Sequence, residues 1–399
     1  MITPASRLGC LLVLSLLLGG LGSAAHAQIE ELPRPDSAHA ASFGVSVAIG
    51  DSIAVVGASG ETECGPNAGA VYVYRREAGT VFDDWEAVAR LTPRTCRPNS
   101  FFGERVALSG ERLLVSAAAS ESFGGRDTNA AYLFARSENG EWRQTARFTS
   151  PSDRTEGTYA AGIDLDGDRA VVSTSGSPDA NRHGAVYVYE HDASVDTWRQ
   201  TARLSTRRPL DDGVLGRAVA LDGNRLAVAA STYFEREPGS VYVFEYETDQ
   251  WRETARLPNV DAFFIELDLD GSTLLVGENR AADNAGRATL YDRQQDGGWT
   301  RTATLQPSNP YESGSFGTAV SLNLPWALVT GYGEQLGKDF NIDRVVYTFR
   351  RNADTWRQRT ILDIGEVDFG AALDQHSSRA LISSVPNGAP GSVYVVQLP

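Results

Sequence analysis

Short apolar runs recur along most of this chain. Each run is five to eight residues long, rich in Val, Ile, Tyr and Ala, and bounded by Gly, Asp, Asn or Pro, which is typical of a short β-strand. In GAVYVY at 69–74, Val71 and Val73 lie on one face of the predicted strand and Tyr72 and Tyr74 on the other, because strand side chains alternate. Both faces are apolar or aromatic, so we expect a neighbouring sheet to cover each of them.

The apolar runs return in a fixed order. Each unit has a Phe-Gly step with an apolar run, a run similar to IAVVGAS (53–59), a run similar to GAVYVY, and a Trp-led segment such as WEAVARL (85–91). The Phe-Gly position or its substitute falls at Phe43, Phe102, Tyr159, Leu215, Phe263, Phe316 and Phe369. The chain therefore contains seven units of about 53 residues, a period that is typical of repeat architectures.

Tight turns join the first and second runs of most units. Gly50-Asp51, Asp166-Gly167, Asp222-Gly223 and Asp270-Gly271 stand there, and such pairs between alternating hydrophobic residues mark β-hairpins. Four antiparallel strands per unit, repeated seven times, predict an all-β fold, the seven-bladed β-propeller. No segment shows a 3.6-residue apolar stripe over ten or more positions, so we expect almost no helix and disfavour an open α/β enzyme.

The two ends of the chain complete one unit between them. The seventh unit ends at its third run, SVYVVQL, without a Trp-led segment, while QIEELPRP precedes the first Phe-Gly step. We therefore expect residues 28–35 to supply the outer strand of the last blade and to close the ring, which removes two open sheet edges.

The outermost predicted strands carry Trp and Arg in repeated positions. The tryptophans are Trp85, Trp142, Trp198, Trp251, Trp299 and Trp356. Their place at the start of each outer strand favours packing between neighbouring blades over a stacking ladder for a sugar or cofactor. The arginines of the WRQTAR segments are expected to line a solvated edge strand, where charge discourages pairing with other sheets.

The pairing of Phe43-Gly44 with Gly57-Ala58-Ser59, repeated along the mature chain, resembles the FG-GAP repeat proteins, which include the N-terminal propeller of integrin alpha subunits. The resemblance implies the same seven-bladed fold. This chain departs from the repeat where Tyr159 replaces the Phe-Gly phenylalanine, at Phe263, which no glycine follows, and where Ser173-Thr174 or Gly277-Glu278 replaces Gly-Ala.

Many members of that family bind calcium through a D-x-D-x-D-G-x-x-D loop between the first two strands. The nearest match here is Asp164-Leu-Asp166-Gly167-Asp168, where Arg169 replaces the glycine and Val172 the last acid. Because Asp164 also suits a strand and Asp166-Gly167 a hairpin turn, we expect structural turns, with no metal site and no cofactor. Asp268-Leu-Asp270-Gly271 is a weaker match.

The first residues have the form of an export signal. Arg7 precedes the apolar run 11–18 and the A-x-A sequence Ala25-His26-Ala27, which predicts cleavage after Ala27 and a mature domain at 28–399. We expect a secreted, periplasmic or cell-surface protein without a membrane span. Cys64 and Cys96 are the two cysteines left after cleavage, and in an exported chain such a pair predicts a disulfide. The net charge of −15 disfavours nucleic acid as a partner.

Candidate chemistry lies in the long polar loops. In a four-stranded blade the loop between the second and third strands and the loop into the next blade open on one face of the ring, here called the long-loop face. The disulfide is expected there too. Candidate ligand-binding residues on this face are Asp127, Arg182, His183, Glu235 and Asp283. Function in repeat folds gathers on the face that carries such insertions.

No catalytic residue is assigned from the sequence. The histidines have no metal-ligand spacing and no G-x-S-x-G elbow occurs, so the first hypothesis is a monomeric, non-catalytic binding or adhesion module for a protein or glycan. The alternative is an extracellular polysaccharide lyase or glycosidase. Two carboxylates facing each other across the axis of the ring would favour the enzyme, and an axis lined by Ala, Gly and Val would count against it.

Overall fold

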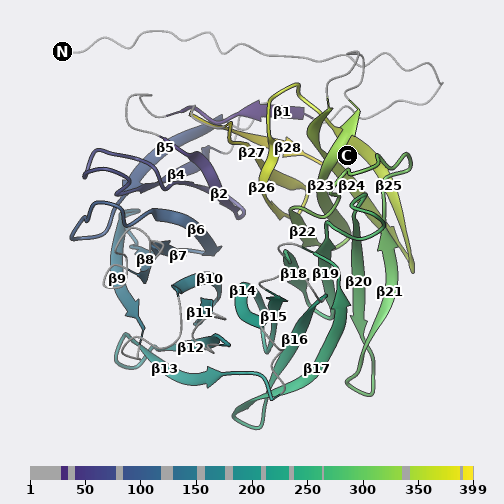
Figure 1. Ribbon diagram of the computed structural model, residues 1–399. Coiled ribbons are helices and arrows are strands. Elements are labelled where there is room, and N and C mark those ends of the chain that lie inside the picture. The colour runs from purple at the N-terminus through teal and green to yellow at the C-terminus, as the bar shows by residue number, and fades with distance from the viewer. Residues whose placement is uncertain are drawn as a thin grey trace.

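The protein is a ring of seven four-stranded antiparallel sheets (Figure 1). The computed structural model describes residues 28–34, 41–77, 84–117, 129–150, 158–175, 183–207, 213–232, 238–262, 265–334, 342–386 and 390–398. None of these residues is helical. The predicted all-β, seven-bladed propeller is therefore confirmed.

The blades follow one another along the chain. Blade 1 contains β2 (Phe43–Ile49), β3 (Ile53–Ala58), β4 (Ala70–Glu77) and β5 (Asp84–Leu91). Blade 2 contains β6 (Phe102–Ser109), β7 (Arg112–Ala117), β8 (Ala130–Arg136) and β9 (Trp142–Thr149). Blade 3 contains β10 (Thr158–Asp166), β11 (Arg169–Ser175), β12 (Ala185–Asp192) and β13 (Thr197–Leu204). Blade 4 contains β14 (Gly213–Asp222), β15 (Arg225–Thr232), β16 (Gly239–Glu247) and β17 (Gln250–Val260).

The other three blades repeat this order. Blade 5 contains β18 (Leu267–Asp270), β19 (Thr273–Glu278), β20 (Arg287–Arg293) and β21 (Trp299–Leu305). Blade 6 contains β22 (Val320–Asn323), β23 (Trp326–Glu334), β24 (Ile342–Asn352) and β25 (Thr355–Leu362). Blade 7 contains β26 (Phe369–His376), β27 (Arg379–Ser384) and β28 (Ser392–Gln397), and its fourth strand is β1 (Gln28–Glu31). In every blade the first strand lies nearest the axis of the ring (Figure 1).

The N-terminal strand closes the ring, as predicted. β1 pairs antiparallel with β28, from Gln28 opposite Gln397 to Glu31 opposite Tyr394. The pairing continues past the strand, where the Leu32 amide donates to the Val393 carbonyl at 2.8 Å. The Leu32 side chain is buried in the core shared by blades 7 and 1. Closure is therefore made by apolar packing as well as by the strand ladder.

The paired glycines of the repeat stand where neighbouring blades touch backbone to backbone. A Cβ built on Gly57 of blade 1 would lie 2.1 Å from the carbonyl oxygen of Gly103 in blade 2. Gly103 itself has a positive φ of 90°. Gly277 meets Gly317 in the same way at the junction of blades 5 and 6. The Phe-Gly and Gly-Ala steps are thus two halves of one contact between blades.

We expect Gly57→Ala to destabilise the protein by about 3 kcal/mol or more, because relief of the clash with the Gly103 carbonyl requires a backbone shift between two blades. Gly50→Ala is the matched control, since its new Cβ would find only ordinary contacts, the nearest at 3.5 Å. Urea denaturation of both variants provides the measurement. Equal stability of the two variants would contradict this explanation of the motif.

The outer-strand tryptophans pack between blades, as predicted. Trp85 joins a core cluster with Leu381 and Val393 of blade 7, and Trp299 joins one with Ala227 and Val241 of blade 4. Blade 7 has no outer-strand tryptophan. At its junction with blade 6, Trp326 from the second strand of blade 6 is buried in the shared core instead. Trp326, the seventh tryptophan, thus lies at the junction of blades 6 and 7, where no outer-strand tryptophan packs.

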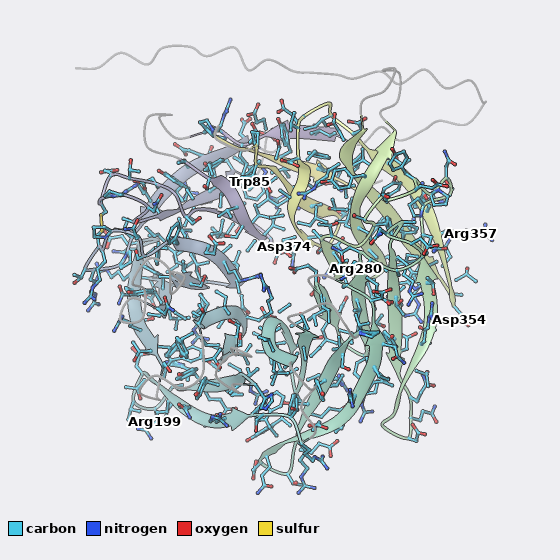
Figure 2. All side chains as sticks on the ribbon, viewed as in Figure 1. Trp85, Arg199, Arg280, Asp354, Arg357 and Asp374 are labelled. Atoms are coloured by element: carbon cyan, nitrogen blue, oxygen red, sulfur yellow. A yellow bond between two sulfur atoms is a disulfide. The ribbon has the colours of Figure 1, made fainter. Side chains whose placement is uncertain are left out.

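The arginines of the outer strands divide into two groups. Arg143 and Arg199 are exposed on the rim, as expected for edge strands (Figure 2 shows Arg199 pointing outward). Arg147 and Arg256, four residues further along the repeat, lie instead over the rings of Tyr132 and Tyr242 at 5.6 and 5.7 Å. The second arginine therefore pairs with the tyrosine of the GAVYVY strand beside it.

The turns at the opposite face link each blade to the next. The Asp166 carboxylate accepts the Gly223 amide at 2.7 Å, and the Asp270 carboxylate accepts the Leu324 amide at 2.6 Å. Asp222 accepts the Gly271 amide in the same way. The aspartates of the Asp-Gly turns are thus used as acceptors between blades.

Candidate functional site

A disulfide fixes two loops of the long-loop face. Cys64, in the loop after β3, is bonded to Cys96, in the linker from blade 1 to blade 2, with their Cα atoms 5.8 Å apart. The predicted pairing is confirmed. Closing a loop of this length restricts the unfolded chain and stabilises a protein by about 3 kcal/mol.

A buried ion pair holds the same loop of blade 1. Glu61 is 1% exposed, and its carboxylate accepts hydrogen bonds from Nε and Nη2 of Arg90 at 2.7 to 3.0 Å. Arg90 also reaches Glu63 at 3.1 Å. The hydrogen bonds to Glu61 and the charges of Glu61 and Glu63 raise the pKa of Arg90 against the opposing effect of burial, which is the largest single influence. The loop is therefore anchored to the outer strand of its own blade.

A second buried pair holds the corresponding loop of blade 5. Glu278 is 2% exposed and accepts from Arg287 through Nε at 3.0 Å and Nη2 at 2.6 Å. Thr289 donates to the same carboxylate. In blade 1 these two ion-pair positions are Ala58 and Ala70. In this unit the glutamate that replaces the alanine of Gly-Ala is thus matched by an arginine that replaces the paired alanine on the neighbouring strand.

We expect Glu278→Ala to lower the free energy of unfolding by about 3 kcal/mol, because it leaves the Arg287 guanidinium half-buried without its carboxylate. The double variant Glu278→Ala/Arg287→Ala should be less destabilised, since it restores the pair of alanines found in blade 1. Thermal unfolding of both variants tests this. A double variant that is less stable than Glu278→Ala would show that the two replacements do not compensate each other.

The loop held by Glu278 presents an exposed polar turn. Ala282, Asp283 and Asn284 have positive φ values of 53°, 57° and 68°, in consecutive positions. The Asn284 carbonyl accepts the Ser315 amide at 2.9 Å, so the turn is tied to the linker that leads to blade 6. Asp283 is exposed. Left-handed residues other than glycine persist where the surrounding structure fixes them, often at ligand sites.

The sequence-predicted site residues are only partly placed. His183 is half-buried near the junction of blades 3 and 4, where its carbonyl accepts the Leu215 amide at 2.9 Å. Asp283 belongs to blade 5, and the structure shows no contact between the two. Asp127, Arg182 and Glu235 lie outside the described residues.

Three aspartates from alternate blades face the axis of the ring. Asp164, Asp268 and Asp374 occupy the same position on β10, β18 and β26 (Figure 2 shows Asp374 pointing toward the centre). Each also accepts an inner-strand amide of the following blade, from Leu221, Leu322 and Ile49, at 2.6 to 2.7 Å. These carboxylates therefore join blades 3 to 4, 5 to 6 and 7 to 1.

The aspartates hold their protons more tightly than usual. Burial raises the pKa of Asp164 and Asp268 from 3.8 to about 7, and that of Asp374 to about 8. The accepted amides oppose this rise, while the negative charge of other aspartates adds to it. Part of this group is therefore protonated near neutral pH.

Nearer the long-loop face, three charged side chains come from inner strands or from the residue directly before one. Arg105 lies in blade 2, Arg217 in blade 4 and Glu266 in blade 5. Burial raises the pKa of Glu266, and the positive charges of Arg105 and Arg217 oppose that rise. The axis is therefore not lined by Ala, Gly and Val alone.

Sequence reasoning missed Arg105 and Glu266, although the repeat contained a signal for them. Both stand three residues after the Phe-Gly phenylalanine or its substitute. The other five units have small residues at this position: Ser46, Gly162, Ala218, Ala319 and Ala372. The available indication was a charged residue at a position that is small in the other units, at or just before the innermost strand.

Two general features bear on metals and membranes. Within the described ranges, no three His, Cys, Asp or Glu side chains form a metal-binding group, and the expected lack of a calcium site stays a prediction. The described part of the chain also has no helix long and apolar enough to cross a membrane.

Comparison with known proteins identifies the repeat and the fold. A family model described as the FG-GAP repeat matches residues 27–74 and 85–134. No curated protein sequence matches the chain. Among solved structures, Kuenenia stuttgartiensis hydrazine synthase is similar with a TM-score of 0.58 and 12% identity, over 92% of this chain and 97% of that one.

A second similar structure is the periplasmic gluconolactonase of Pseudomonas aeruginosa, with a TM-score of 0.50 and 14% identity, over 82% of this chain and 92% of that one. A third is a putative 6-phosphogluconolactonase from Bacteroides uniformis, with a TM-score of 0.50 and 12% identity, over 80% and 85%. At these identities the likeness concerns the fold alone.

Proposed function

Because this chain is an FG-GAP repeat protein folded as a seven-bladed propeller, we propose that it is an exported binding module that holds a protein or a glycan on its long-loop face. The observation that carries the proposal is the double anchoring of that face. Loops of blades 1 and 5 are each fixed by a bidentate Arg–Glu pair whose glutamate is at most 2% exposed. Loops ordered in advance lose less entropy when a ligand binds.

Export is part of the same proposal. The predicted signal sequence at 1–27 lies outside the described residues, and the Cys64–Cys96 disulfide supports an oxidising compartment. We infer a secreted, periplasmic or cell-surface monomer with an extracellular partner. The intact mass of the exported protein tests the predicted cleavage, because cleavage after Ala27 leaves Gln28 as the first residue.

The binding proposal is tested with a glycan array and a panel of surface proteins, using residues 28–399 with and without calcium. The variant is Asp283→Asn, which suits the positive φ of 57° but removes the charge from the long-loop face. The matched control is Asp249→Asn, an exposed aspartate with φ of 61° in the turn between β16 and β17 on the opposite face. Weaker capture by the first variant alone supports the proposal. Capture that both variants retain unchanged, or that the control alone loses, counts against it.

A second candidate function is an enzyme acting on polysaccharide. The observation that favours it is Glu266, a half-buried carboxyl near the axis whose pKa is raised by burial against the charges of Arg105 and Arg217, which suits a general acid. Polysaccharides and sugar lactones are the substrates to test, the latter because two proteins of this fold are described as lactonases. Turnover that Glu266→Gln abolishes would establish the enzyme and refute the non-catalytic reading.

A further inference from the structure

The long-loop end of the ring axis carries a mixed group of charges that neither the FG-GAP contacts nor blade packing explains. Arg105 and Glu266 occupy equivalent positions in blades 2 and 5, and Arg217 stands one residue earlier in blade 4. Inner strands surround the axis (Figure 1), and the charges of Arg105 and Arg217 both act on Glu266, so the three groups lie toward one region. Arg217 is exposed although β14 is an inner strand, so solvent reaches this region.

Arg105 and Glu266 differ from the two ion pairs of the loops. Glu61–Arg90 and Glu278–Arg287 are in direct contact, with hydrogen bonds of 2.6 to 3.0 Å. Across the described residues, no hydrogen bond or ion pair joins the Arg105 guanidinium to the Glu266 carboxylate, although the charge of Arg105 acts on Glu266. Both side chains are half-buried. A donor group and an acceptor group therefore face the same region without satisfying each other.

The charges of the arginines and of Glu266 restrict the chemistry of a ligand that can bind among them. The guanidinium fork of arginine matches a carboxylate with two parallel hydrogen bonds. Glu266 can accept from, or when protonated donate to, a hydroxyl group. Further along the axis lie Asp164, Asp268 and Asp374. The ionised part of this group repels an anion, which favours the end with the arginines for a bound carboxylate.

From this arrangement we propose that Arg105, Arg217 and Glu266 bind a uronic acid residue at the end of an otherwise neutral glycan. The uronate carboxylate faces the arginines, and an adjacent sugar hydroxyl faces Glu266. A chain end fits better than an extended polyuronate because the protein has a net charge of −15. The proposal rests on the binding function above and names its ligand class.

The test is calorimetric titration of residues 28–399 with glucuronosyl-xylobiose, with neutral xylotriose, with free glucuronate and with polygalacturonate. We expect glucuronosyl-xylobiose to bind at least tenfold more tightly than xylotriose or polygalacturonate. Arg105→Met should raise its Kd at least tenfold, with a smaller change for Arg105→Lys, which keeps the charge but not the fork. Arg357→Met is the control, because that arginine points away from the ring on its outer rim (Figure 2).

The outcomes separate this site from the wider function. Binding of glucuronosyl-xylobiose that Arg105→Met leaves unchanged, or that xylotriose matches, overturns the axial site. If the array finds a ligand sensitive to Asp283→Asn but glucuronosyl-xylobiose does not bind, the axial site fails while the binding function stands. If free glucuronate binds as tightly as the oligosaccharide, the ligand is a small sugar acid, and the proposal that the site binds the end of a glycan is refuted. A Tm of Arg105→Met within a few degrees of wild type shows that any loss comes from the site.

Discussion

Deletion of residues 28–34 should lower the free energy of unfolding by about 5 kcal/mol and make the protein self-associate. The deletion removes the four-residue ladder between β1 and β28 and the buried Leu32 side chain. A buried leucine contributes about 2 kcal/mol and each ladder hydrogen bond about 1 kcal/mol. The exposed edge of β28 then offers unpaired amides and carbonyls to other chains. Urea denaturation and size-exclusion chromatography measure the two effects.

Leu32→Ala provides the control for the deletion, because it keeps the ladder and removes only the core contact. We expect it to cost about 2 kcal/mol and to leave the protein monomeric. A deletion no worse than Leu32→Ala would show that the closing strand contributes nothing beyond one side chain.

The protein should lose several kcal/mol of stability as the pH rises from about 4 to about 8. Asp164, Asp268 and Asp374 titrate near 3.8 in the unfolded chain but at about 7, 7 and 8 in the folded one. Below pH 4 they are protonated in both states. Between the pKa of the unfolded chain and that of the folded chain, the unfolded chain releases protons that the folded chain retains, so rising pH favours unfolding. Above pH 8 the loss of stability is complete. One pKa unit corresponds to about 1.4 kcal/mol.

The slope of stability against pH reports these aspartates together with Glu266, whose pKa burial also raises. Glu245 and Asp192, whose pKa values are lowered, finish their contribution below about pH 5. Asp374→Asn should therefore flatten the slope between pH 5 and 8, whatever its effect on stability at one pH. Asp249→Asn, on an exposed turn, should leave the slope unchanged. Stability that is constant or rises over this window in the wild type would contradict the account.

The repeat and the ring were predictable because they depend on local patterns. Alternating runs, Asp-Gly turns and the absence of a Trp-led segment after SVYVVQL determined blade number and closure without any long-range contact. The role of Gly57 was not visible, since its partner, Gly103, stands 46 positions later in the next unit and the contact is between backbones. Conversely, the Glu278–Arg287 pair looked like two unrelated departures from the repeat.

The candidate site was predicted less well than the fold. The long loops pointed to the correct face for the disulfide, but the charges at the axis lie on inner strands or directly before one, where a search among the long loops does not find them. Aligning the seven units column by column shows Arg105 and Glu266 as exceptions to a small-residue position. Their approach toward one region depends on ring geometry, which no single unit contains.

Hydrogen exchange with and without glucuronosyl-xylobiose is the most direct test of the claim that ligands are held at the long-loop end of the axis. We expect slower exchange of amides at 103–106, 215–218 and 265–267, and no change in the turns at 50–53, 166–169 and 222–225 on the opposite face. Slower exchange in those turns, or on the outer strands alone, would place the ligand elsewhere and contradict the account.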